Sequence, residues 1–128
     1  MTIRFIAFLA LAFVICAAFQ CRKDTVQNSC FKGKLTIKGM CGNYTVQLLQ
    51  GSLDSANIEA NWQDEVSGKT YTNVFALGNP CSFPDSIKQG DEFYFTLGSE
   101  PQNCLLCLAY YPKPKKSLSI KVLDKPCQ

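Results

Sequence analysis

The chain has 128 residues, of which 13 are Lys or Arg, 10 are Asp or Glu and none is His. This length accommodates one domain, and a net charge of +3 is too small to predict binding to nucleic acid. The absence of histidine excludes Ser-His and Cys-His nucleophile pairs, the usual catalytic zinc ligands and haem attachment through Cys-x-x-Cys-His.

The N-terminal segment has the pattern of a secretory signal. Arg4 precedes an apolar run over residues 5–19 that contains no charge. The run is shorter than the ~20 residues that a transmembrane helix needs, and small residues lie near its end. These features are typical of a signal peptide, so we expect residues 1–20 to direct export; a short membrane anchor is the alternative.

Two cleavage sites are compatible with this signal. Cleavage after Ala18 releases a soluble chain that keeps seven of the eight cysteines. Cleavage before Cys21, with lipid on its thiol, leaves six cysteines that can all pair. An unpaired thiol in a secreted protein needs an explanation, and a lipid on Cys21 supplies one. The cysteine count therefore favours lipidation.

The start of the mature chain is similar to that of a known class of proteins. Its sequence, Cys21-Arg22-Lys23-Asp24, resembles the Cys-Lys-Lys-Asp starts of small exported lipoproteins of Gram-negative bacteria, although Phe19 and Gln20 stand where small residues are usual. The resemblance covers about the first twenty-four residues. It implies a lipoprotein of the Gram-negative envelope, facing the periplasm or the cell surface, held to the membrane through Cys21. Residues 21–29 would be a tether, and residues 30–128 a single β domain.

From Cys30 onward, apolar and polar residues alternate with the period of β-strands. The alternation covers residues 31–38 and recurs near 44–48, 58–62, 71–77, 92–97 and 118–122, with turn residues between these segments. Residues 105–111 are ambiguous between a strand and a short helical turn. Five or six short strands predict a mostly β fold, either a small antiparallel OB-like barrel or a sandwich. An immunoglobulin-like sandwich would use Cys41, Trp62 and Cys104.

Six cysteines in the domain are predicted to form three disulfides. They are Cys30, Cys41, Cys81, Cys104, Cys107 and Cys127. Their spacing does not determine which cysteine pairs with which. A small domain buries little surface, so disulfides would stabilise it without implying any function.

Cys104 and Cys107 form a Cys-x-x-Cys motif, which is typical of thiol-disulfide oxidoreductases. Such an enzyme has the motif in a βαβ setting with an exposed first cysteine. Here the neighbours are apolar and no βαβ pattern precedes them, so structural disulfides to distant cysteines are favoured. Since every catalytic pattern fails, we expect no enzymatic activity, no cofactor and no metal site.

Two aromatic residues are candidates for a binding surface. Phe83 lies in a loop over residues 78–89, and Tyr94 is out of phase with the inward-facing Phe93 and Phe95. Loops on rigid scaffolds often carry binding residues. The expected function is a non-enzymatic binding or structural module of the cell envelope, with an envelope protein or a glycan as partner. The alternatives are an exported oxidoreductase that uses Cys104 and Cys107, and a soluble secreted inhibitor or effector.

Overall fold

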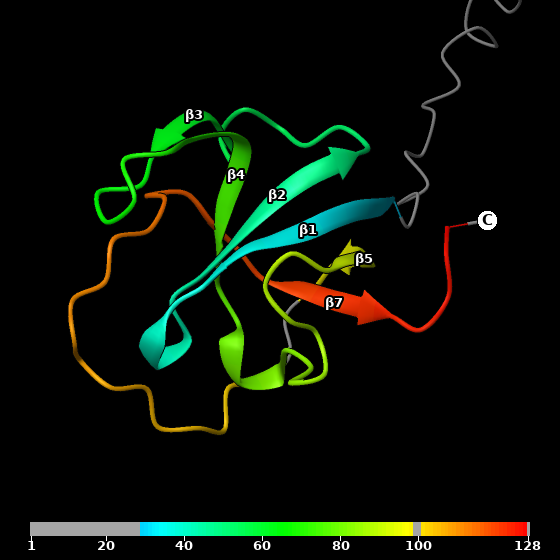
Figure 1. Cartoon of the computed structure of the whole chain (residues 1–128). Coiled ribbons are helices and arrows are strands. Elements are labelled where there is room, and N and C mark those ends of the chain that lie inside the picture. The colour runs from blue at the N-terminus through cyan, green and yellow to red at the C-terminus, as the bar shows by residue number, and fades with distance from the viewer. Residues whose placement is uncertain (1–28, 99–100, 128) are drawn as a thin grey trace, which may run out of the picture.

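The computed structural model describes residues 29–98 and 101–127 (Figure 1). The predicted signal peptide, the lipidated Cys21 and the tether up to residue 28 lie outside the described residues and stay predictions. Within the described ranges, no helix combines the length and the apolar character needed to cross a membrane.

The described chain forms β-strands and two short 3-10 helices. In order they are β1 (Cys30–Lys38), η1 (Met40–Gly42), β2 (Tyr44–Gln50), β3 (Glu59–Gln63), β4 (Thr70–Leu77), η2 (Pro80–Ser82), β5 (Glu92–Leu97), β6 (Ser117–Leu118) and β7 (Ile120–Leu123). In β5, buried Phe93 and Phe95 alternate with more exposed neighbours, as the period of two predicted. The predicted mostly β fold is confirmed. The last predicted strand is interrupted at Ser119 and becomes β6 and β7.

All the strands belong to one sheet, with the order β3-β4-β2-β1-β5-β7 and with β6 paired to β4. The pairings are antiparallel except that of β4 with β6, which is parallel and spans two residues. Because only Ser119 separates β6 from β7, this C-terminal segment contacts both β4 and β5. Because the pairing of β4 with β6 spans only two residues, the sheet is strongly curled but is not closed into a regular barrel. A sandwich-like arrangement over one core describes it better.

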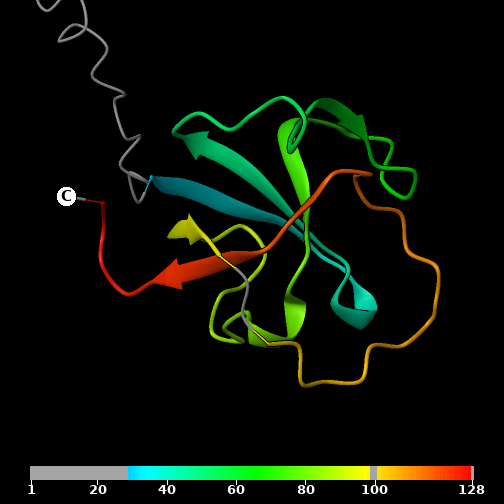
Figure 2. The same cartoon turned by 180° about the vertical axis from the view of Figure 1, so that it is seen from behind.

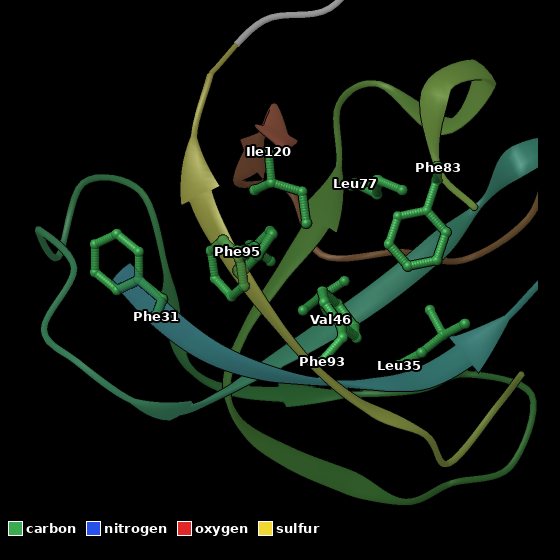
Figure 3. Close-up of a cluster of buried hydrophobic side chains, with 9 residues drawn as sticks. Phe31, Leu35, Val46, Leu77, Phe83, Phe93, Phe95 and Ile120 are labelled. Carbon is green, nitrogen blue, oxygen red and sulfur yellow. The ribbon is translucent and has the colours of Figure 1, made fainter. Parts of the chain in front are cut away.

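Aromatic contacts across the core show how strongly the sheet curls. The rings of Phe75 on β4 and Phe95 on β5 have centroids 5.9 Å apart, although β2 and β1 lie between these strands in the sheet. Adjacent strands are separated by about 4.8 Å, so a flat sheet would hold the two residues about 14 Å apart. The enclosed core is drawn in Figure 3 and comprises Phe31, Leu35, Val46, Phe75, Leu77, Phe83, Phe93, Phe95 and Ile120.

Three disulfides crosslink the domain, and all six predicted cysteines take part. The bonds are Cys30–Cys127, Cys41–Cys107 and Cys81–Cys104. The Cys41–Cys104 pairing of the immunoglobulin-like interpretation is wrong, because these two cysteines bond to different partners. Disulfides persist in oxidising compartments and are rare in the cytosol. The three bonds therefore indicate an oxidising location outside the cytoplasm.

The three disulfides lie at two opposite ends of the domain. Cys30–Cys127 joins the start of β1 to the C-terminal segment, and both lie on the same side of the molecule in Figures 1 and 2. From there the nine residues of β1 run about 30 Å to η1 at the opposite end. The other two bonds involve Cys41 in η1 and Cys81 in η2. The predicted tether thus joins the domain at the end remote from these two bonds.

Candidate functional site

The most unusual surface of the domain is an extended segment at the end remote from Cys30. Residues 101–116 leave the body of the domain near η2, pass along its outside and return at β6, as the yellow to orange trace shows (Figures 1 and 2). We call this segment the arch. Its first ten residues are all exposed, and Leu105 and Leu108 are fully so, at 102% and 101%. Residues 105–111, for which the sequence left a strand and a short helical turn as alternatives, form neither.

Covalent bonds hold the first half of the arch to the body. Cys104 is bonded to Cys81 and Cys107 to Cys41. The side-chain amide of Gln102 adds two hydrogen bonds: its Nε2 donates to the Gly78 carbonyl (2.6 Å), and its Oε1 accepts from the Cys81 N–H (3.3 Å). The backbone on either side of Leu105 is therefore fixed in place.

Buried prolines and hydrogen bonds hold the second half of the arch. Pro112 and Pro114 are buried while Lys113 is exposed, an alternation that turns the prolines toward the body. The Glu59 carboxylate accepts hydrogen bonds from the backbone N–H groups of Lys115 and Lys116, the second at 3.2 Å. This half of the arch is thereby joined to β3.

Tyr110 provides one more link between the arch and the body. Its hydroxyl donates a 3.1 Å hydrogen bond to Oε2 of Glu65, in the turn between β3 and β4. This hydrogen bond and the charge of the same carboxylate raise the pKa of the Tyr110 phenol, which therefore keeps the proton that it donates. Tyr110 is nevertheless 79% exposed, so most of its ring faces solvent.

The turn that presents Glu65 is itself well ordered. Asp64 is 4% exposed and accepts hydrogen bonds from the Ser67 hydroxyl (2.5 Å) and from the backbone N–H groups of Val66 and Ser67. Burial acts to raise the pKa of Asp64, but these hydrogen bonds outweigh it and hold the pKa below its usual value. The charged form of Asp64 thus fixes the turn, while the next residue, Glu65, points to the arch.

A groove of about 660 Å³ separates the arch from the body. Trp62 lines one wall and is stacked on Tyr71 of β4, with ring centroids 6.1 Å apart. The remaining lining includes Asn43, Glu59, Glu65, Leu77, Leu106, Tyr110, Tyr111, Lys113 and Lys115. Two carboxylates and two ammonium groups balance one another, so the groove has aromatic walls and no net charge.

Two glycines permit the close approach of the arch to the segment around η1. A Cβ added to Gly39 would lie 2.6 Å from the ring of Tyr111. Gly42 has a φ of +73°, and a Cβ there would lie 2.9 Å from Pro80 and 3.1 Å from Leu106. Only glycine has both the backbone conformation and the small size that this position needs.

Replacing Gly42 by alanine is therefore expected to destabilise the domain and to displace the arch. The change combines the strain of a positive φ, about 1–2 kcal/mol, with an overpacking cost of about 1–3 kcal/mol. Gly68→Ala is the matched control, because Gly68 has a φ of +71° but no atom within 4 Å of an added Cβ. Urea denaturation should give the larger loss for Gly42→Ala; equal losses would show that neither Pro80 nor Leu106 is packed closely against Gly42.

The two predicted binding residues do not form one surface. Phe83 is 7% exposed and packs edge-on against the rings of Tyr44 and Phe93, so it belongs to the core and is not available to a ligand. Tyr94 is half-buried on the outer face of β5, where the ammonium of Lys32 lies 5.9 Å from its ring centroid. Tyr94 lines a separate hollow of about 430 Å³, together with residues that include Asp124, Lys125 and Pro126 close to the Cys30–Cys127 bond.

The Cys-x-x-Cys motif does not supply a dithiol in the structure, because Cys104 and Cys107 are each bonded to a distant cysteine. Over residues 29–98 and 101–127, no three His, Cys, Asp or Glu side chains cluster closely enough to hold a metal ion. The sequence signal for the arch was an apolar run beside Cys107, but such runs are usually buried.

No protein-family model, curated protein or solved structure matches the chain, so its function is argued from the arch and the groove.

Proposed function

We propose that the chain is a lipoprotein of the Gram-negative envelope, anchored by a lipid on Cys21, whose domain is a non-enzymatic binding module. The arch is its binding surface. The observation that carries this proposal is the complete exposure of Leu105 and Leu108 on a segment held at both ends. Exposed apolar patches mark sites of interaction on folded domains, and four large exposed apolar or aromatic residues follow one another closely along the arch: Leu105, Leu106, Leu108 and Tyr110.

The energetics of the arch support a binding role. Burying a leucine side chain stabilises a protein by about 1.5–3 kcal/mol, yet neither Leu105 nor Leu108 is buried in the domain. Two disulfides and the Tyr110–Glu65 hydrogen bond hold this exposed segment in an ordered shape. A partner that covers the arch gains the burial of these leucines without the entropic cost of ordering the loop.

The arrangement of the two ends supports an anchored protein. The six domain cysteines form three pairs, which leaves Cys21 as the cysteine of the mature chain that is free to carry lipid. The predicted tether, residues 21–29, leads into β1, and β1 begins at the end of the domain opposite the arch (Figure 2). Anchoring at Cys21 would therefore direct the arch away from the membrane.

The test is the mass of the protein purified from its own membranes. We expect an N-terminal peptide that begins at Cys21 and carries lipid, and we expect a Cys21→Ser variant to lose the lipid. Arg22→Ser, one residue away, is the control and should keep it. An unlipidated N-terminus at Phe19 would contradict anchoring and would favour the soluble secreted protein.

A further inference from the structure

We propose that the arch is a substrate-like binding loop for a serine endopeptidase that prefers large apolar residues, with Leu108 as the side chain that enters its specificity pocket. This inference rests on the proposed role of the arch as a binding surface and names the class of its partner. In chymotrypsin-like enzymes, this specificity pocket is a hydrophobic slot.

The chain around Leu108 is accessible to such an enzyme. Residues 105–110 have no regular secondary structure and are exposed. Leu108 is 101% exposed, so its whole side chain is available to a pocket. It is followed by Ala109, whose small side chain allows a close approach of the enzyme to the bond between them.

The two flanks of this bond are attached to the body independently. On the N-terminal side, Cys107 is bonded to Cys41. On the C-terminal side, Tyr110 is hydrogen-bonded to Glu65, and the buried Pro112 follows. The loop is thus preorganised, and preorganisation is the feature that lets interfaces of ordinary size bind tightly.

The same attachment explains how the arch would inhibit the enzyme instead of serving as its substrate. Hydrolysis breaks the C–N bond between Leu108 and Ala109, placing the hydroxyl of water on the Leu108 carbonyl carbon and a proton on the Ala109 nitrogen. Both new ends stay with the domain, because Cys107 remains covalently bonded to Cys41 and the segment after Ala109 remains packed through the buried Pro112 and Pro114. The amine stays beside the carbonyl, which favours re-formation of the bond with loss of the same water.

Leu105 is equally exposed but is less suited to this role. It lies between Cys104 and Cys107, which are both covalently bonded to the body, whereas Leu108 has a covalent restraint only on its N-terminal side. A protease needs extended backbone on both sides of the bond that it attacks. Leu105 is therefore the matched control for Leu108.

The experiment measures inhibition of chymotrypsin and trypsin by the mature protein, purified with its disulfides intact. We expect the wild-type protein to inhibit chymotrypsin and to leave trypsin active. Leu108→Lys should weaken inhibition of chymotrypsin roughly 100-fold, as for a central interface residue, and should create inhibition of trypsin. Leu105→Lys changes a contact outside the specificity pocket, so it should weaken inhibition of chymotrypsin less than Leu108→Lys and should create no inhibition of trypsin. Leu49→Lys, an exposed leucine on β2 outside the arch, should change neither. All the substituted side chains are exposed, and a non-reduced peptide map checks that the three disulfides form in each variant.

Three outcomes would overturn the proposal. They are rapid cleavage after Leu108 without inhibition, no effect on either protease, and inhibition of chymotrypsin that Leu108→Lys leaves unchanged. If peptidoglycan fragments instead alter the fluorescence of Trp62, the sole tryptophan, while the proteases are unaffected, the arch and groove belong to a glycan. None of these results bears on the lipid at Cys21, so failure of the protease target and failure of anchoring are distinguished.

Discussion

Replacing Cys30 and Cys127 together by serine is expected to lower the free energy of unfolding by about 3–4 kcal/mol. The bond joins residues 97 apart in sequence, but Cys41–Cys107 already shortens that loop in the unfolded chain. The loop that Cys30–Cys127 still closes contains about 30 residues, and the expected loss follows from its closure entropy. Urea denaturation monitored by Trp62 fluorescence measures the change.

Reduction provides the control for this prediction. In excess reductant the wild-type protein also lacks the Cys30–Cys127 bond, so the difference between the two proteins should nearly vanish. A loss below about 1 kcal/mol under oxidising conditions would mean that the bond does not restrain the unfolded chain beyond the other two disulfides. Since small domains are stable by about 5–15 kcal/mol in total, the predicted loss is a large part of the stability.

The strands were predictable because their signal is local. The alternation of residues along β5 places Phe93 and Phe95 on one face and Tyr94 on the other. The register with β1 agrees, because Phe95 is paired with Phe31 and Tyr94 with Lys32. The same reasoning identifies the last strand, apart from the interruption at Ser119. A period of two needs only a few adjacent residues, and burial of one face enforces it.

The position of Phe83 was not predictable because distant residues determine it. Asn79, just before η2, is 2% exposed; its Nδ2 donates to the Ile120 carbonyl (2.7 Å) and its Oδ1 accepts from the Ile120 N–H (2.9 Å). These bonds dock the loop against β7 and turn Phe83 into the core. Sequence alone shows an aromatic residue in a loop rich in turn residues, which is equally compatible with exposure.

The exposure of the arch was not predictable either, because its residues indicate burial. A run of leucines and tyrosines over residues 105–111 suggests a buried strand or helical turn, because apolar residues are most often inside. The pairing of Cys104 and Cys107 with Cys81 and Cys41 keeps this run on the outside. Disulfide pairing depends on which cysteines the folded sheet brings together, and their spacing does not reveal it.

Phe95→Ala is expected to destabilise the domain by about 3–5 kcal/mol, as for other large-to-small changes in a close-packed core. Phe95 is 0% exposed, and its ring contacts those of Phe31, Phe75 and Phe93 at centroid distances of 5.3 to 5.9 Å (Figure 3). Its contact with Phe75 joins strands that are not neighbours in the sheet. Removing the ring leaves a cavity where the curled sheet is held together.

Tyr94→Ala is the control on the same strand. Tyr94 is half-buried on the outer face, and its interaction with the Lys32 ammonium contributes about 0.5–1 kcal/mol. Urea denaturation of both variants should therefore give a loss for Phe95→Ala several times larger than for Tyr94→Ala. Similar losses would contradict a core centred on Phe95. A large loss for Phe95→Ala with unchanged disulfides would show that packing across the curl stabilises the sheet in addition to the covalent bonds, since the disulfides restrain the unfolded chain and the aromatic contacts act in the folded state.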